Sequence, residues 1–348
     1  MNTYICETCG TQFAPSVQPP AARPICEDER QYVGWDGQRW TTHETLATEH
    51  SLRIGEDADL VAIGMAGSFG IPQRALMLPT AAGNLMWECI SLVTAEAVTR
   101  LRERGGVDRI VISHPHFYAS MVQWSEALGN VPILLHAADK AWVQRRSRHI
   151  EFWRGDELSL GNGITLVRTG GHFPGSTALH WHNGVHGRGA LFVGDSPQVA
   201  TNRRSVSFMY SYPNYVPMRP SDVREMRERL ARFDYDDVYG FSWGRNIIGG
   251  GRAAVNASFE HYLAIVGGEN DSRDVLSRRD ETAVSSQVTD SGPSRFEHAE
   301  GRSQSWQTRG MWQPALSKGR ATLLASGQVS CGAFVARNHA QNSDGRMR

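Results

Sequence analysis

Three histidines and one aspartate, each following an apolar run typical of a β-strand, constrain the fold of this chain most. They are His114, His116, His172 and Asp195. Imidazole nitrogen and carboxylate oxygen are ligands that zinc accepts in proteins. The pattern therefore predicts a zinc site built at strand ends and, with it, metal-assisted hydrolysis.

Two of these imidazoles stand two residues apart in His114-Pro115-His116. In extended backbone, side chains at i and i+2 point to the same side. Pro115 favours an extended conformation at His114. Both rings are thus predicted to approach one ion; the alternative is a pair of surface histidines in a loop.

The other two candidates follow glycines. Gly170 and Gly171 permit a sharp turn that would place His172 at the end of the preceding strand. Gly194 gives similar access to Asp195. A carboxylate at the exposed end of a strand usually only contacts solvent or caps nearby backbone amides. Beside three histidines, Asp195 becomes a candidate ligand or water-orienting group.

Residues 31–265 alternate strand-like and helix-like runs. Helices are predicted over Thr94–Arg104, which ends at two glycines, and over Asp222–Phe233, which follows a Pro-Ser start. Strands outnumber helices, which predicts sheet-on-sheet packing covered by helices. The predicted strands are Leu60–Gly64, Ala75–Leu78, Asn84–Cys89, Arg109–Ile112, Pro132–His136, Ile164–Arg168, Thr177–His182, Ala190–Gly194 and Asp237–Phe241.

Residues 1–30 resemble a small zinc ribbon, with cysteines in two turns. Cys6 and Cys9 form the first turn, and Cys26 belongs to the second. Arg23 stands where the second turn would carry its other cysteine. A closed zinc site needs four ligands, and three thiols remain. The alternatives are a ribbon zinc on Cys6, Cys9 and Cys26, or a degenerate ribbon packed loosely on the main domain.

Residues 266–348 differ in composition from the rest of the chain. They are rich in Ser, Gly, Gln and charged residues, and their apolar residues follow no period. Such a segment cannot bury enough apolar surface to offset the entropy of ordering. It is predicted to be a disordered tail.

Composition limits the function classes. The hydrophobic content of 40% supports a sizeable core, and the formal net charge of zero argues against a nucleic-acid or acidic-membrane partner. No run approaches the ~18 apolar residues of a membrane span. An odd five cysteines without a disulfide framework, and no recognisable signal peptide, predict a cytoplasmic protein. The oligomeric state stays open.

Together these motifs resemble the metallo-β-lactamase superfamily of metallohydrolases over roughly residues 50–265. His-x-His, Gly-His-x-Pro-Gly-Ser and Gly-Asp occur in the family's order at residues 114–116, 171–176 and 194–195. Residues 83–88 resemble the strand upstream of the first motif. The resemblance implies an α/β (α+β) fold, a four-layer αββα sandwich with the site at one edge of its two sheets. Within the family, the chain looks closest to bacterial members with an N-terminal zinc-ribbon-like extension.

The chain departs from this family at the second metal. The usual first motif is His-x-His-x-Asp-His, but Tyr118 and Ala119 stand at its last two positions. The family's final histidine follows a late strand, and residues 238–244 contain none. The resemblance therefore implies at most one tightly bound metal, zinc, on the three histidines, with Asp195 as a fourth or outer ligand.

One zinc would leave a position for water and lower its pKa to about 7. Asp195 could orient this nucleophile or accept its proton. Tyr118 could donate to a developing oxyanion, or be a packed aromatic residue. The aromatic loop containing Tyr210 and Tyr212 either forms a wall of the substrate pocket or packs on a neighbouring element.

These features predict a mononuclear zinc hydrolase that acts on a small molecule with a carboxylic ester, thioester or lactone. The alternative is a catalytically impaired member of the fold that binds a ligand or partner. A nucleic-acid-processing member is disfavoured by the neutral charge. The residues do not identify the substrate.

Overall fold

The computed structural model describes residues 1–81 and 83–266. The predicted disordered tail over 266–348 therefore lies, except for its first residue, outside the described residues. Within the described ranges, no helix combines the length and apolar character needed to cross a membrane.

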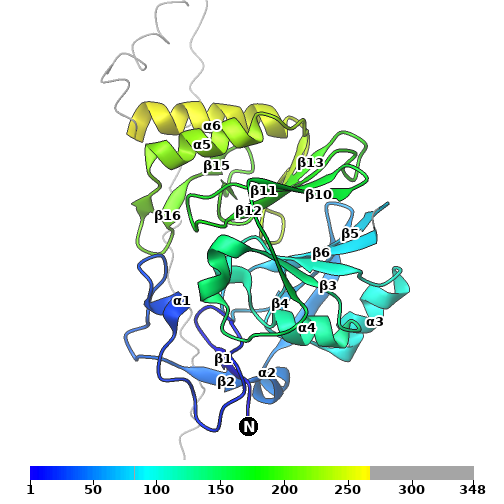
Figure 1. Cartoon of the computed structure of the whole chain (residues 1–348), viewed down its shortest axis with the longest axis vertical. Coiled ribbons are helices and arrows are strands. Elements are labelled where there is room, and N and C mark those ends of the chain that lie inside the picture. Colours follow the sequence, from blue (N-terminus) through cyan, green and yellow to red (C-terminus); the bar gives the residue numbers. More distant parts are fainter. Residues whose placement is uncertain (82, 267–348) are drawn as a thin grey trace, which may run out of the picture. The chain divides into compact units, whose positions relative to one another are not determined.

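Two large sheets dominate the described chain (Figure 1). The strands of the first are, in spatial order, β3 (Ser51–Asp57), β4 (Leu60–Ala66), β5 (Arg74–Thr80), β6 (Gly83–Trp87), β7 (Arg109–Val111), β8 (Ile133–His136) and β9 (Ile150–Trp153). Those of the second are β10 (Glu157–Gly161), β11 (Ile164–Arg168), β12 (Thr177–Trp181), β13 (Ala190–Phe192), β18 (Asp237–Tyr239) and β19 (Asn246–Ile247).

Strand direction is mixed in both sheets. In the first sheet, β3 to β6 pair antiparallel and β6 to β9 pair parallel. In the second, neighbours pair antiparallel except β13 and β18. The first large crossover, from β6 to β7, contains α3 (Ala95–Glu103), and that from β7 to β8 contains η1 (Pro115–Phe117) and α4 (Met121–Ala127). The second sheet's crossover, from β13 to β18, contains α5 (Pro220–Leu230).

Alternating side chains divide the core into layers. In β4, Leu60 and Ala62 join the cluster between the sheets, while Val61 and Ile63 face the cluster under α3 and α4. A third cluster joins the second sheet to α5 and α6 (Gly251–Val266). Figure 1 shows α5 and α6 outside one sheet and α3 and α4 outside the other. This is the predicted four-layer αββα sandwich.

The two predicted helices form close to their predicted limits. In α3, the Thr94 side chain caps the helix by accepting from the Ala97 backbone N–H, and Ala97, Val98 and Leu101 are buried. Helix α5 begins at Pro220, earlier than predicted, because proline suits the first helical position. Several elements were not predicted from the sequence, including β3, α2 (His43–Glu49) and α4.

The N-terminal segment is firmly packed, unlike the loosely attached ribbon considered above. It contains β1 (Tyr4–Cys6) and α1 (Pro24–Glu27), and β1 pairs with β2 (Trp40–Thr42). The Gln12 amide donates to the carbonyl of Ala119, and Ser91 Oγ donates to the carbonyl of Gly10. Through these two bonds the N-terminal segment contacts Ala119, three residues after the His-x-His motif, and Ser91.

The remaining elements are short. They are η2 (Ala137–Trp142) and the two-stranded pairs β14 (Gln198–Val199) with β15 (Val206–Ser207) and β16 (Met209–Ser211) with β17 (Val216–Pro217).

Candidate metal centre

The His-x-His motif bends rather than continuing the strand. His114 is extended, with φ −167° and ψ 171°, as expected before proline. Pro115–Phe117 then form a 3-10 turn. The expectation of an extended motif is therefore wrong beyond His114. The two rings meet because the turn carries His116 back toward His114, with ring centroids 5.2 Å apart.

His172 is placed by the predicted glycine turn after β11. Gly170 and Gly171 have φ of 67° and 77°, a left-handed conformation that glycine adopts at little cost. The amides of Thr169 and Gly170 both donate to the carbonyl of Ser176, which closes the loop. A side chain at position 171 would lie only 2.4 Å from Met218 Sδ. The left-handed backbone favours glycine at this position, and the Met218 side chain packs against it.

Asp195 follows β13 and reaches the same place from the second sheet. A Cβ at Gly194 would come within 2.3 Å of Ser113 Oγ, so the glycine lets the two chain segments approach. Gln198 Nε2 donates to Asp195 Oδ1 at 2.7 Å. This bond fixes the carboxylate with Oδ2 facing the imidazoles.

Four ligand atoms converge at the junction of the two sheets. Asp195 Oδ2 lies 3.3 Å from His114 Nε2, 3.8 Å from His116 Nδ1 and 3.7 Å from His172 Nε2. His116 Nδ1 and His172 Nε2 are 3.0 Å apart. Zinc–nitrogen bonds of 2.0–2.1 Å in a tetrahedron require ligand separations of about 3.3 Å. The spacing thus fits one zinc-sized ion.

The outer contacts of the imidazoles also suit metal binding. His172 Nδ1 lies 3.2 Å from the carbonyl of Met209, to which it donates, leaving a lone pair on Nε2. His114 Nδ1 lies 2.8 Å from Ser113 Oγ. His114 Nε2 is buried, and no hydrogen bond satisfies it within the described chain. A buried polar atom without a partner is what a ligand atom shows when its metal is left out.

Burial sets the charge state of the cluster. It lowers the pKa of His116 to about 4 and that of His172 well below its usual value. Burial acts to raise the pKa of Asp195, but the adjacent imidazoles of His114 and His116 lower it well below the usual range. Neutral imidazoles beside an ionised carboxylate are the forms that bind a metal ion.

The position expected for a second metal is filled by core side chains. Tyr118 and Ala119 are buried in the hydrophobic cluster under the first sheet. Phe241, in the stretch that lacks the family's last histidine, packs on Phe117 with ring centroids 5.2 Å apart. The Phe117 and Phe241 rings offer no ligand atoms at this position.

Tyr118 and the two loop tyrosines occupy different surroundings. The Tyr118 hydroxyl donates to the carbonyl of Asp139 at 3.5 Å, which favours the packed aromatic over the oxyanion donor. The Tyr212 hydroxyl donates to the carbonyl of Asp195, and its ring lies 6.0 Å from that of His172. The Tyr210 hydroxyl donates to Glu29 Oε1 at 2.5 Å. Tyr212 therefore packs on the centre, whereas Tyr210 meets the N-terminal segment.

Arg30, from the N-terminal segment, is a contact that the sequence reasoning missed. Its Nη1 donates to the carbonyl of His172 at 3.1 Å, and its guanidinium lies 3.9 Å from the centroid of the Phe173 ring. Nε and Nη2 bind both oxygens of Asp28 at 2.5 and 2.9 Å. This arginine holds the loop that carries His172. No local pattern marks it, because the partners are 142 residues apart.

Glu88 was also missed as a functional candidate. It follows β6, is fully buried, and has a φ of 63°, which is uncommon for a residue other than glycine. Its carboxylate accepts from the amide of Ser113, next to His114. Burial raises the pKa of Glu88 to about 8. The signal in the sequence that could have identified Glu88 is an acidic residue directly after an apolar strand.

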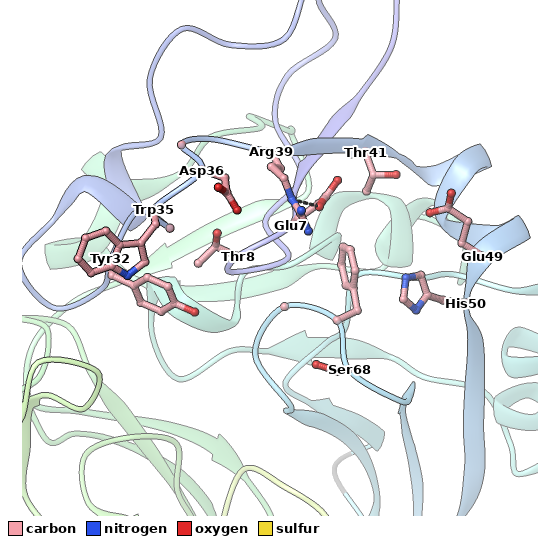
Figure 2. A pocket seen from close by; sticks show the side chains of 14 residues that line it. Glu7, Thr8, Tyr32, Trp35, Asp36, Arg39, Thr41, Glu49, His50 and Ser68 are labelled. Atoms are coloured by element: carbon pink, nitrogen blue, oxygen red, sulfur yellow. Dashed lines mark hydrogen bonds and ion pairs between the residues drawn. The ribbon is translucent and has the colours of Figure 1, made fainter. Parts of the chain in front are cut away.

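Two cavities lie near the N-terminal segment. One of about 450 Å³ adjoins the glycine turn of His172; its lining includes Arg30, Arg168, Arg219, Arg229, Gly170 and Tyr210. Another of about 570 Å³ is shown in Figure 2, where Tyr32 and Trp35 lie at one end and Glu49 and His50 at the other. None of the four candidate metal ligands lines either cavity.

The cysteines of the N-terminal segment also meet. Cys6, Cys9 and Cys26 have sulfur atoms within 4.8 Å of one another, and all three are buried. The members of each predicted group therefore lie together: the three histidines and the aspartate form one cluster, and the three cysteines form another.

The layered sheets, with three motifs at the strand ends in the expected order, give this chain the metallo-β-lactamase fold. Over 242 residues the chain is 41% identical to the uncharacterized protein YmaE of Bacillus subtilis (strain 168), covering 69% of this chain and 88% of YmaE. The chain belongs to the same family as YmaE. No protein-family model matches it.

The chain is also similar to proteins of solved structure. The chain matches the DIM-1 metallo-β-lactamase with a TM-score of 0.46 and 13% identity, over 64% of this chain and 100% of that one. It matches the Flv1 flavodiiron core of Synechocystis sp. PCC6803 with a TM-score of 0.44 and 12% identity, over 62% and 61%. At such identities these similarities carry nothing about substrate or metal.

Proposed function

We propose that the chain is a mononuclear zinc-dependent hydrolase of small molecules that contain a carboxylic ester, thioester or lactone. One observation carries the proposal. Three imidazole nitrogens and one carboxylate oxygen lie within 4.8 Å of one another, and four of their separations, 3.0–3.8 Å, suit a zinc ion. Nitrogen-rich ligation favours zinc over iron or manganese.

Bound zinc would polarise a substrate carbonyl and lower the pKa of a water molecule to about 7. The chain's own residues prepare the site for this chemistry. His172 is fixed by the carbonyl of Met209, and Asp195 is fixed by Gln198, so neither side chain must reorganise. Where the three imidazoles hold the zinc and water takes the fourth position, Asp195 Oδ2 would accept a proton from that water.

A second candidate function, ligand or partner binding without catalysis, is favoured by the burial of the cluster. His114, His116 and His172 are 1–2% exposed and Asp195 is 7% exposed. A site this closed admits substrate only if a covering segment moves. The apolar residues at the second-metal position are consistent with a fold that has lost part of its catalytic apparatus.

Zinc content and hydrolysis measured together separate these functions. The protein would be purified, loaded with zinc, freed of excess metal and screened against ester, thioester and lactone substrates. His116→Ala removes a ligand, and His182→Ala alters an exposed histidine as a matched control. We expect one zinc and hydrolysis in the unaltered and His182→Ala proteins, with both lost in His116→Ala. Zinc binding without turnover of any substrate class would favour the binding function instead.

A further inference from the structure

The three N-terminal cysteines form a compact buried group. Cys6 Sγ and Cys26 Sγ are 3.6 Å apart, and Cys9 Sγ lies 3.4 Å from Thr11 Oγ1. All three side chains are at most 1% exposed. Such a knuckle, with thiols from two turns, is the usual setting for a structural zinc ion.

Arg23 stands at the position in the chain where a fourth zinc ligand would be expected, three residues before Cys26. Its Nη1 lies 3.0 Å from Cys6 Sγ and 3.2 Å from Thr8 Oγ1, and the residue is 1% exposed. A guanidinium stays protonated in proteins and has no lone pair to offer a metal. Its positive charge beside the sulfur would also repel a divalent cation. The donor set therefore does not fit a closed tetrahedral zinc site.

Burying a guanidinium is unfavourable unless an anion accompanies it. The described side-chain contacts of Arg23 are Cys6 Sγ, Thr8 Oγ1 and the Trp40 ring at 5.9 Å, with no carboxylate among them. The group that can supply a negative charge is thus Cys6. Ionised as a thiolate, it would accept from Arg23 and from the thiol of Cys26.

The pKa values agree in direction with this geometry. Hydrogen bonds from Cys26 and Cys9, together with the charge of Arg23, lower the pKa of the Cys6 thiol. The hydrogen bond to Cys6 raises the pKa of Cys26, which stays a neutral donor. One thiolate and two thiols give the cysteine group a single negative charge, which the positive charge of Arg23 balances.

We propose that Arg23 takes the place of a metal ion in the N-terminal segment. The guanidinium is the counter-ion of a Cys6 thiolate, and the cysteine group binds no zinc. This ion pair lies in a small cluster with Phe13 and Ile25 and joins the first cysteine turn to α1. At this position the ion pair fixes the segment that leads to Arg30, and Arg30 in turn contacts the loop of His172.

Zinc analysis of full-length variants tests the proposal. Cys26→Ser should bind as much zinc as the unaltered protein, because the cysteine group contributes none. Arg23→Cys should bind about one more zinc per chain, because a fourth thiol completes the tetrahedral donor set. Loss of one zinc in Cys26→Ser, or no gain in a folded Arg23→Cys, would overturn the proposal.

The ultraviolet absorbance of thiolate gives a second readout. At neutral pH we expect one thiolate per chain in the unaltered protein, absent in Cys6→Ser. Cys89→Ser is the matched control, because Cys89 is buried in the main core and burial raises its pKa well above the usual value. Equal absorbance in the unaltered and Cys6→Ser proteins would contradict the ion pair.

A third measurement needs no variant and so does not depend on variants folding. The unaltered protein is digested with chymotrypsin, which can cleave after Tyr4 and Phe13, before and after a strong chelator removes its zinc. Cleavage within residues 1–30 should stay unchanged, because an ion pair and not a metal holds the segment. New cleavage there after chelation, reversed by added zinc, would overturn the proposal.

Discussion

The guanidinium of Arg30 joins the N-terminal segment to the loop of His172, a candidate metal ligand. Arg30→Met would remove the hydrogen bond to the His172 carbonyl and the contact with Phe173. Outer partners of metal ligands typically contribute 10–100-fold to metal affinity. Because Arg30 acts through the backbone, we expect roughly a tenfold loss of zinc affinity.

Competition with a coloured chelator measures this affinity. Arg39→Met is the matched control, because Arg39 pairs with Glu7 at the surface. Arg30→Lys, which keeps the charge but not the fork that binds Asp28, should restore only part of the affinity. Unchanged zinc affinity in a folded Arg30→Met would show that Arg30 does not position the centre.

His186 is a second residue with a measurable role, at the end of the sandwich away from the candidate centre. It lies between Asp237, in β18 of the second sheet, at 2.7 Å and Asp59, in the turn between β3 and β4 of the first sheet, at 2.9 Å. Hydrogen bonds to Asp237 and Asp59 raise the pKa of His186 above 6.5. Its stabilisation is therefore complete below the unfolded-state pKa and is lost as pH rises through the higher folded-state pKa.

The variant His186→Gln should lose stability mainly under mildly acidic conditions. Because His186 is partly exposed and Asp59 is exposed, the loss should be roughly 0.5–1 kcal/mol near pH 6. Near pH 9 it should approach zero. Urea unfolding of both proteins at the two pH values measures this, and a larger loss at the higher pH would contradict the assignment.

At the scale of elements, the approach of β7 and β13 depends on Gly194. Gly194→Ala would place a Cβ 2.3 Å from Ser113 Oγ and 3.1 Å from His114 Nδ1. Relieving this clash moves the ends of the two strands apart, so His114 and Asp195 should no longer share an ion. We expect zinc affinity to fall at least tenfold, by analogy with the loss of outer partners.

Calorimetric zinc titration measures the Gly194→Ala effect. Gly34→Ala is the control, since a Cβ there meets only a backbone oxygen at 4.0 Å. If Gly194→Ala bound zinc as tightly as Gly34→Ala, the strand ends would not be positioned by this contact.

The sequence predicted those features of the centre that depend on local chemistry. Apolar strand runs, the glycine turn before His172 and the extended backbone of His114 follow from nearby residues. The 3-10 turn after Pro115 was missed, because the i, i+2 rule assumes that the chain stays extended. Arg30 and Glu88 were missed because their contacts join distant parts of the chain.

For the molecule as a whole, the two sheets are joined by a buried polar network around Arg74. Its Nε donates to Asp57 at 2.6 Å, its Nη1 to the carbonyl of Gly240 at 2.5 Å, and its Nη2 to Asn246 at 2.8 Å. Arg74 is fully buried. Removing one partner of a buried ion pair typically costs about 3–5 kcal/mol, because the other charge is left uncompensated.

Arg74→Met should therefore lower the free energy of unfolding by about 3–5 kcal/mol. Arg104→Met is the surface control, because Arg104 pairs with the exposed Glu56, and it should cost less than about 1 kcal/mol. Urea denaturation measures both. Equal effects would mean that the network adds little to the cohesion of the two sheets.

X-ray absorption at the zinc edge tests the central claim most directly, because it reports which atoms surround the metal. We expect one zinc per chain with nitrogen neighbours from His114, His116 and His172 and an oxygen neighbour from Asp195 or water, all at about 2.0–2.2 Å. We expect no sulfur neighbour. Sulfur at about 2.3 Å would place metal on the N-terminal cysteines, and a protein that takes up no zinc would contradict the metal centre itself.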